Sequence, residues 1–171
     1  MTATDEIRTD RLLLRRAREV DLTDIHAIMS DPAVMRYWSS PPHADIAQTE
    51  KWLRSMIDVD LSTSDDFVIE QDRRVIGKLG CWQLPEIGFH LASDHWGQGY
   101  ASEALAAYLD RRRSIGEPAT LIADVDPRNR ASLMLLTRHG FVETGRASGT
   151  WQVGNELCDS VYLAIDLNSD L

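Results

Sequence analysis

The sequence has few cysteines and an excess of acidic over basic residues. Its two cysteines, Cys81 and Cys158, lie in apolar, strand-like segments without CxxC or CxxH spacing. We therefore expect neither a metal site nor a redox pair, and we interpret both as core thiols. The 18 Lys and Arg against 27 Asp and Glu give a net charge of −9. This charge opposes the attraction to phosphates that dominates nucleic-acid affinity, so we expect no nucleic-acid partner.

The sequence also lacks long apolar runs, linkers and repeats. No apolar segment reaches the roughly 18 residues that span a bilayer, and the N-terminal segment MTATDEIRTD does not resemble a signal peptide. No Gly/Ser linker, low-complexity tract or internal repeat divides the chain. Hydrophobic residues make up 43% and charged residues 26% of the sequence, as in ordinary globular proteins. We therefore expect one domain over residues 1–171, cytoplasmic and without a membrane partner.

Changes in the period of the apolar pattern predict strands and helices in the first half of the chain. Apolar residues at helical spacing follow Asp21, a suitable N-cap, and the pair Asp31-Pro32 is expected to end that helix. A second helix is predicted over 46–57, where apolar side chains share one face. Two apolar runs around a polar turn predict a β-hairpin. The strands expected in this half are 11–16, 67–70 and 74–82.

The second half of the chain alternates strands with helices. The expected elements are, in order, a strand at 86–91, a helix from near Gly99 to Ile115, a strand at 119–125, a helix over 128–139, and strands at 141–147 and 157–166. Gly116 and Gly140 follow the two helices, as glycines often do at helix ends. This order predicts an α/β or α+β domain with a mixed sheet and helices on its faces, and it excludes a helical bundle.

The segment 96–102 joins a strand to a helix through a glycine-containing turn. Several backbone N–H groups then point outward at the positive end of the helix dipole, where they suit an anion. Gly97 and Gly99 let the backbone approach a phosphate, and Ala101 keeps the first helical turn thin. The alternative is a connection that uses glycine only for its turn geometry. A P-loop and a dinucleotide fingerprint are excluded, because no Lys-Ser or Lys-Thr follows and the third glycine is absent.

Four segments form an ordered set of motifs along the chain. They are RTDRLLLR at 8–15, DPAVMRY at 31–37, WGQGYASEA at 96–104, and DPRNRAS at 126–132, which continues to RHGF at 138–141. Together they resemble the GCN5-related N-acetyltransferases (GNAT), and in particular their RimJ/RimL branch. The third segment resembles the acetyl-CoA-binding motif of this superfamily, and the branch commonly has Trp at its first position. The resemblance covers nearly the whole chain.

The resemblance implies a fold and an activity. The fold would be a single-domain, mixed and mostly antiparallel sheet flanked by helices on both faces. The activity would be transfer of an acetyl group from acetyl-CoA to a primary amine, and the branch implies the N-terminal amine of a protein or peptide. Alternatives are acetylation of a small amine, such as an antibiotic, a polyamine or an amino acid, and a non-catalytic CoA-binding sensor. We expect a monomer or homodimer.

The resemblance also implies that the strand, turn and helix around the third motif hold acetyl-CoA. Backbone groups of the strand would hold the pantetheine arm where that strand splays from its neighbour, and Asn129 would meet the same arm. Many relatives place a Tyr seven residues after this Asn as the acid for the leaving thiolate, but here the position is Leu136. Ser132 shares a helix face with Leu136, so its hydroxyl is a candidate donor, with a helix-capping role as the alternative. The candidate cofactor-binding residues are Phe89, His90, Leu91, Trp96, Gly97, Gln98, Gly99, Tyr100, Ala101, Ser102, Asn129 and Ser132.

Acetyl transfer requires a neutral amine, so we expect a carboxylate that takes a proton from the acceptor ammonium. Glu86 is the first candidate, because it begins the strand before the glycine turn and resembles a catalytic glutamate of several relatives. A solvated strand-end Glu is the alternative. Asp124, on the next strand, matches the other place where the superfamily puts a base. Tyr37, Trp38 and Trp82 are candidate walls of the acceptor groove, with core packing as the alternative for each.

Overall fold

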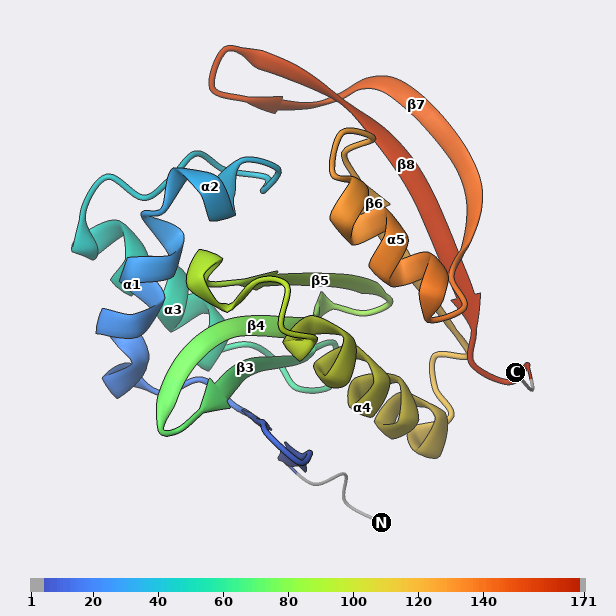
Figure 1. Cartoon of the computed structure of the whole chain (residues 1–171), viewed down its shortest axis with the longest axis horizontal. Coiled ribbons are helices and arrows are strands. Elements are labelled where there is room, and N and C mark those ends of the chain that lie inside the picture. The colour runs from blue at the N-terminus through green and yellow to red at the C-terminus, as the bar shows by residue number, and fades with distance from the viewer. Residues whose placement is uncertain (1–4, 170–171) are drawn as a thin grey trace.

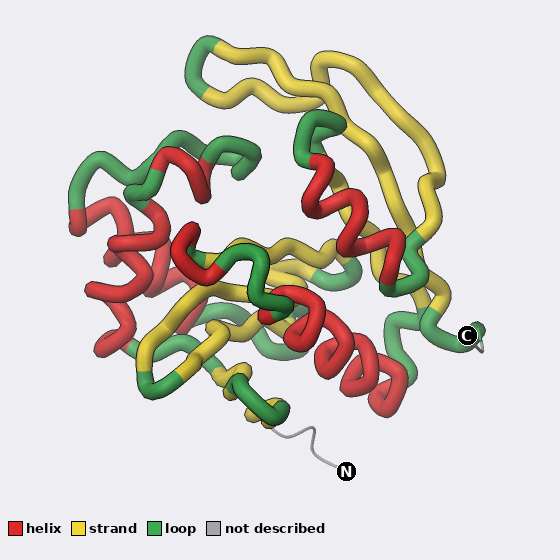
Figure 2. Tube along the Cα trace, in the orientation of Figure 1, coloured by secondary structure: helices red, strands yellow, loops and turns green. Residues whose placement is uncertain are grey.

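The computed structural model describes residues 5–169, which form one sheet with helices on both sides (Figures 1 and 2). The helices are α1 (Leu22–Met29), α2 (Pro32–Met35), α3 (Ile46–Ile57), α4 (Tyr100–Ile115) and α5 (Arg130–Arg138). The strands are β1 (Glu6–Arg8), β2 (Leu13–Arg15), β3 (Asp65–Gln71), β4 (Arg74–Gln83), β5 (Glu86–Leu91), β6 (Thr120–Val125), β7 (Val142–Val153) and β8 (Glu156–Asp166). No helix among the described residues is long and apolar enough to cross a bilayer.

The sheet has eight strands in the order β1-β2-β3-β4-β5-β6-β8-β7. Neighbouring strands are antiparallel except β5 and β6, which run parallel. A parallel pair needs a crossover connection, and α4 supplies it between these two strands. The predicted mixed and mostly antiparallel sheet is therefore confirmed.

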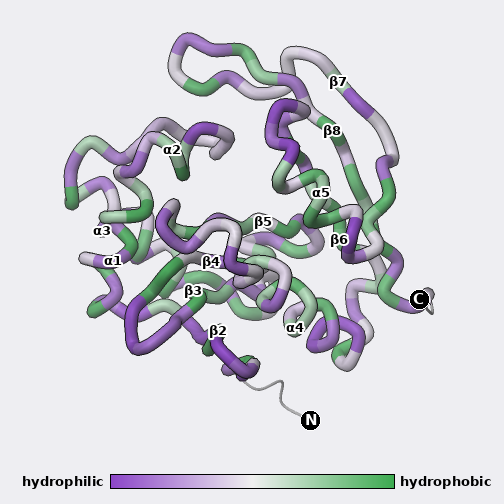
Figure 3. The backbone as a smooth tube through the Cα atoms, in the orientation of Figure 1, coloured by the Kyte–Doolittle hydropathy of each residue, from purple (hydrophilic) through white to green (hydrophobic). Residues whose placement is uncertain are grey.

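Different helices cover the two faces of the sheet (Figure 1). Successive strand residues point to opposite faces, so Phe67 packs with Tyr108 of α4 and Leu136 of α5, whereas Val68 packs with Leu53 of α3. Helices α1 and α2 lie on the same face as α3. Figure 3 shows apolar stretches along the central strands and polar stretches in surface turns. Helices on both faces are therefore confirmed as well.

Strands β5 and β6 separate soon after they meet (Figure 1). Glu86 pairs in register with Ile122, whose N–H donates to the Pro85 carbonyl at 3.1 Å. No further register pair joins these strands within the described residues, although β5 continues to Leu91 with its other edge paired to β4. The backbone of 89–91 therefore has no strand partner on the side that faces β6. The expected splay is present here.

The N-terminal part contains two elements that were not predicted, β1 and α2. The strand expected at 11–16 is present as β2, but it is the second strand and not the first, because the Thr9 N–H donates to the Leu12 carbonyl at 3.0 Å and turns the chain back from β1. The pair Asp31-Pro32 ends α1 as predicted, but it also begins α2. The Asp31 carboxylate accepts an N–H of α2 at 2.8 Å, and Pro32 fits the first helical position because it lacks an N–H there.

The C-terminal hairpin is longer than predicted. β7 extends to Val153 instead of ending near Ala147, and β8 begins at Glu156. The outer half of the hairpin is mostly exposed, so no alternation of apolar and polar residues marks it in the sequence. Cys158 lies on this half and is partly exposed, so it is not the core thiol that we expected, whereas Cys81 is buried. The other predicted elements are present, with ends shifted by a few residues.

Candidate active site

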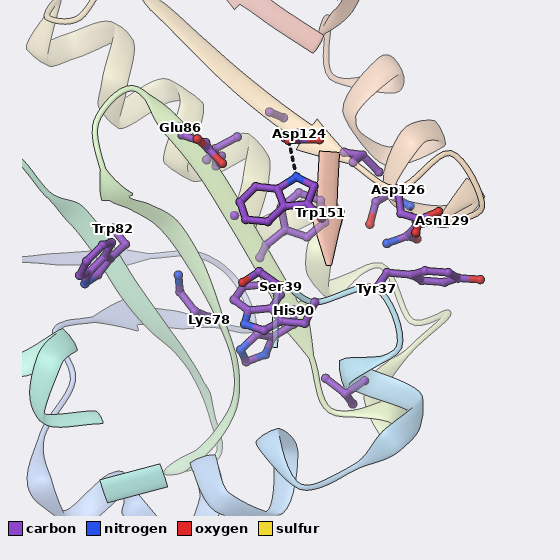
Figure 4. Close-up of a pocket in the computed structure, with 18 of the residues that line it drawn as sticks. Tyr37, Ser39, Lys78, Trp82, Glu86, His90, Asp124, Asp126, Asn129 and Trp151 are labelled. Carbon is purple, nitrogen blue, oxygen red and sulfur yellow. Dashed lines mark hydrogen bonds between the residues drawn. The ribbon is translucent and has the colours of Figure 1, made fainter. Parts of the chain in front are cut away.

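A cavity of about 640 Å³ opens where β5 and β6 separate (Figure 4). Its walls come from β4, β5 and β6, from the α2 and α3 region, from α5 and from the outer half of the β7–β8 hairpin. The residues of the sequence prediction that line it are Tyr37, Trp38, Trp82, Glu86, Phe89, His90, Asp124, Asn129 and Ser132. The structure therefore brings together the residues predicted to contact the amine acceptor and part of the residues predicted to bind acetyl-CoA. The other predicted cofactor-binding residues are Leu91 at the end of β5, residues 96–99 in the turn before α4, and residues 100–102 in the first turn of α4.

The turn before α4 has the backbone geometry of an anion site. Gly97 and Gly99 have φ angles of 71° and 83°, which are left-handed conformations that favour glycine. A Cβ atom at Gly97 would meet no atom within 4 Å, so the turn is open on that side. The first N–H groups of α4 have no acceptor within the helix, and they lie at its positive end. The geometry fits a phosphate group, and so fits the pyrophosphate of CoA.

Arg11 fastens this turn to the N-terminal hairpin. Its Nη1 donates to the Gln98 carbonyl at 3.0 Å, and its Nε donates to the Glu103 carboxylate at 2.7 Å. Its guanidinium lies 4.4 Å from the centre of the Tyr100 ring. The Glu103 carboxylate also accepts the Thr9 hydroxyl at 2.5 Å. Arg11 was not identified from the sequence, although its place in the RTDRLLLR motif was an available signal.

Three side chains in the turn and the first turn of α4 point toward the rest of the protein and leave the backbone N–H groups of the turn open. The Trp96 indole N–H donates to the Leu91 carbonyl at 2.9 Å, which ties the turn to the end of β5. The Tyr100 ring is buried, and its hydroxyl accepts a side-chain amide N–H from Gln71 of β3 at 2.5 Å. The Ser102 hydroxyl lies 2.7 Å from Nε2 of His139, at the end of α5. Tyr100 therefore offers a cofactor little besides its backbone.

The predicted pantetheine-binding residues of β5 point to opposite faces of the sheet. Phe89 and Leu91 pack with the core beneath α4 and α5. His90 points to the other face, where its ring lies 4.8 Å from that of Trp38 and 6.4 Å from that of Trp52. The His90 side chain therefore belongs to the acceptor side of the cavity, and its backbone pairs in register with Lys78 on β4.

Asn129 and Ser132 lie at the start of α5, next to the cavity. The Asn129 side-chain oxygen accepts the Ser132 N–H at 3.2 Å and so caps the helix. We gave helix capping as the alternative role for Ser132, but in the structure the side chain that caps α5 is that of Asn129. No side-chain partner holds the Ser132 hydroxyl within the described part of the chain. Leu136, one helical turn further on, is fully buried and lines the same wall.

Glu86 and Asp124 point to the same face from neighbouring strands. Glu86 pairs with Ile122, and Asp124 follows two residues later on β6, so their side chains share a face. Burial, and to a smaller extent the Asp124 carboxylate, raise the pKa of Glu86 above its usual value. The Trp151 indole N–H donates to the Asp124 carboxylate at 2.7 Å (Figure 4). The β7–β8 hairpin thereby reaches the carboxylate pair.

Aromatic rings surround the acceptor side of the cavity. Tyr37, Trp38 and Trp82 all line it, as expected. Trp38 is partly buried against the α1–α3 core. Trp82 is 52% exposed and Trp151 is 43% exposed, so both present ring surface to solvent at the mouth. Core packing, the alternative for these residues, therefore describes Trp38 better than Trp82.

Asp66, Lys78, Trp52 and Trp151 also line the cavity and were not identified from the sequence. Lys78 interrupts the apolar run of β4, and Asp66 precedes the apolar run of β3, where a buried charged residue is rare unless it is paired. That rarity was the available signal. Trp52 has the spacing of a core residue of its helix, and Trp151 stands in a polar strand, so neither position predicts a contact with a distant residue.

Comparisons with known proteins agree with this geometry. The family model described as the acetyltransferase (GNAT) domain matches residues 11–142. An uncharacterised N-acetyltransferase of Bacillus licheniformis, p20, is 28% identical over 150 residues, which is 82% of this chain and 84% of that protein.

Solved structures share the fold at low sequence identity. RimL, a ribosomal L7/L12 alpha-N-protein acetyltransferase in complex with coenzyme A, has a TM-score of 0.85 and 20% identity, covering 96% of this chain and 99% of that chain. Spermidine N-acetyltransferase from Vibrio cholerae, in complex with CoA and spermine, has a TM-score of 0.80 and 22% identity, covering 93% and 97%. These identities show the fold alone and do not separate the RimJ/RimL branch from others. The family model covers most of the sequence, and the chain belongs to the GNAT family of N-acetyltransferases.

Proposed function

We propose that the chain transfers the acetyl group of acetyl-CoA to the N-terminal amine of a protein or peptide. The observation that carries this proposal is the position of Glu86 and Asp124 at the splay, on the wall of the cavity. A carboxylate pair attracts an ammonium group, and Glu86 has a raised pKa that suits a proton acceptor. The free backbone edge of β5 borders the same cavity from the donor side.

The residues around the splay fit acetyl-CoA, which supplies the reactive thioester when it is bound. The open glycine turn and the N–H groups of 97–102 would hold the pyrophosphate, with the positive charge of Arg11 beside them. The backbone groups of Phe89 and the Leu91 N–H face the splay, because the alternate residues 90 and 92 face β4, and they would hydrogen-bond the amides of the pantetheine arm as a neighbouring strand would. Asn129 and Ser132 would face this arm from α5.

A few residues of the cavity would carry out the reaction. Glu86 accepts the proton of the acceptor ammonium, directly or through one water. Asp124, held by Trp151, draws the ammonium to the splay. The N–H groups of Phe89 and Leu91, which face the splay, stabilise the negative charge that develops on the carbonyl oxygen of the thioester. The Ser132 hydroxyl donates to the leaving sulfur, because Leu136 has no proton to give.

The mouth of the cavity favours an extended acceptor. Trp82 and Trp151 are about half exposed there, so the groove continues to the surface and leaves room for the chain that follows an N-terminal amine. The shared fold of RimL, a protein acetyltransferase, supports this acceptor class. A small cationic amine is the second candidate, since Glu86, Asp124 and Asp159 all line the cavity and since a spermidine acetyltransferase shares the fold.

Release of free thiol from acetyl-CoA, measured with a panel of N-terminal peptides, polyamines and other small amines, tests the proposal. We expect the highest kcat/KM with peptides. A higher kcat/KM for a small amine would reassign the acceptor. Thiol release with none of the amines, from protein that binds CoA in calorimetry, would contradict the proposed reaction and leave a CoA-binding role.

A further inference from the structure

Three strands place polar residues side by side on the acceptor face of the sheet. Lys78 on β4 pairs in register with His90 on β5. In the next row, Gly80 on β4 lies between Asp66 on β3 and Gly88 on β5. All five residues line the cavity. The floor of the acceptor groove is therefore a patch of polar side chains interrupted by glycines, and we call this set of residues the polar floor.

The polar floor is buried but its hydrogen-bonding capacity is not used up. Lys78 Nζ lies 2.8 Å from Asp66 Oδ2, and both side chains are about 95% buried or more. Asp66 Oδ1 and both ring nitrogens of His90 are buried without a hydrogen-bond partner among the described residues. Lys78 has three N–H donors, of which the contact with Asp66 takes one. Buried polar groups are nearly always paired, so unpaired ones at the floor of a cavity point to a ligand or water that completes them.

The polar floor has room for such a group above Gly88. A Cβ atom built at Gly88 would meet only Trp38, at 3.7 Å, which is an ordinary contact distance. The Trp38 ring borders this space, since it also lies 4.8 Å from the His90 ring and 5.8 Å from Lys78 Nζ. A side chain at residue 88 would fill the hollow, and glycine leaves it open toward the cavity.

The charges and donors of the polar floor define the chemistry that fits it. Burial, together with the Lys78 charge, lowers the pKa of His90 to about 3, so the ring is neutral, with one nitrogen a donor and the other an acceptor. Lys78 offers further donors, and Asp66 Oδ1 offers an acceptor. Lys78 and Asp66 compensate each other's charge, so the polar floor favours neither an anionic nor a cationic group. A neutral group that both donates and accepts hydrogen bonds fits the donors of Lys78 and the acceptor of Asp66.

We propose that Asp66, Lys78, Gly88 and His90 form a subsite for a hydroxyl or primary carboxamide that the acceptor carries close to its amine. This inference rests on the proposed function, because the amine itself is placed at Glu86 on the same strand. Glu86, Gly88 and His90 point to the same face of β5, so a polar group a few atoms from the amine would lie over Gly88.

Matched acceptors test the subsite. We expect a peptide with N-terminal Ser to have a kcat/KM at least about tenfold above that of the same peptide with Ala, because a site built for a hydroxyl discriminates against its absence. The kcat/KM should likewise be higher for a peptide with N-terminal Thr than with Val, and higher with N-terminal Asn than with Leu. Equal kcat/KM within each pair would overturn the subsite and leave water as the partner of the polar floor. Acetylation of none of these amines would instead contradict the proposed function.

Two variants and one control locate the preference. Gly88→Ala, which adds one carbon to the hollow without a clash, should reduce the Ser-to-Ala ratio toward one. Gly145→Ala is the matched control, since its Cβ would likewise meet one aromatic carbon, of Tyr162 at 3.9 Å, and neither residue lines the cavity. It should leave the ratio unchanged. His90→Phe should also abolish the preference without lowering the melting temperature, because it removes the unpaired ring nitrogens. A ratio unchanged in both Gly88→Ala and His90→Phe would contradict the assignment of these residues.

Discussion

The indole N–H of Trp151 donates to the Asp124 carboxylate at 2.7 Å, although 27 residues separate them in the sequence. Trp151 stands on the outer half of the C-terminal hairpin, which otherwise projects from the sheet (Figure 1). The hydrogen bond places this ring at the mouth of the cavity and fixes the carboxylate that lies beside Glu86. The hairpin therefore completes the carboxylate pair of the site.

Trp151→Phe keeps an aromatic ring at the mouth and removes its N–H donor. Burial and the Asp124 charge raise the pKa of Glu86, and without the donor this charge is compensated less, so the acid limb of the kcat/KM profile should move to higher pH. We expect kcat/KM below neutral pH to fall about three- to tenfold, since a partly exposed hydrogen bond contributes roughly 1 kcal/mol. Initial rates of thiol release across pH measure the effect. An unchanged pH profile with a raised acceptor KM would show that Trp151 acts only as a wall.

Glu86→Gln removes the proposed proton acceptor and keeps the size of the side chain. Loss of a general base should lower kcat by about 10²- to 10⁴-fold, with little change in CoA affinity. In the unsubstituted protein the raised pKa of Glu86 has a further consequence. Because the base must be deprotonated, activity should decline as pH falls through that raised value. Asp124→Asn should be the milder variant, and a larger loss for Asp124→Asn than for Glu86→Gln would assign the base to β6.

Gly99→Val tests the anion site before α4. Valine is strained at a φ of 83°, and its Cβ would lie 3.4 Å from the Arg11 guanidinium, so the turn should shift and CoA affinity should fall by more than about tenfold. Gly116→Val is the matched control, because Gly116 ends the same helix at a φ of 82° with open space around it. Both variants should lose similar stability in thermal unfolding. Equal CoA affinity of the two in calorimetry would place the pyrophosphate elsewhere.

Local features of the site could be predicted from the sequence, and contacts across the fold could not. Gly97 and Gly99 mark a helix start, because glycine conformation and helix capping depend on neighbouring residues only. The contact of Trp151 with Asp124 depends instead on how far an exposed hairpin reaches, which no apolar pattern encodes. The Lys78–Asp66 pair depends on strand register, and a register shift of one residue between β3 and β4 would place the two side chains on opposite faces of the sheet.

The absence of Tyr at Leu136 leads to the last prediction, which concerns the leaving thiolate. Leu136 lines the cavity, but its side chain is a hydrocarbon and has no proton to give. The Ser132 hydroxyl lies one helical turn before it, lines the cavity, and is not used to cap α5, because Asn129 fills that role.

Ser132→Ala should therefore reduce kcat with little change in the KM for acetyl-CoA. A hydrogen bond to a developing charge contributes about 1 to 2 kcal/mol, which corresponds to a loss of roughly 5- to 30-fold. Ser114→Ala is a suitable control, since the Ser114 hydroxyl bonds the Arg111 carbonyl at the far end of α4. An equal loss in kcat/KM and in CoA affinity would make Ser132 a ground-state binding residue. Intact kinetics in Ser132→Ala would mean that water or the acceptor's own proton neutralises the thiolate, and that α5 takes no part in the chemical step.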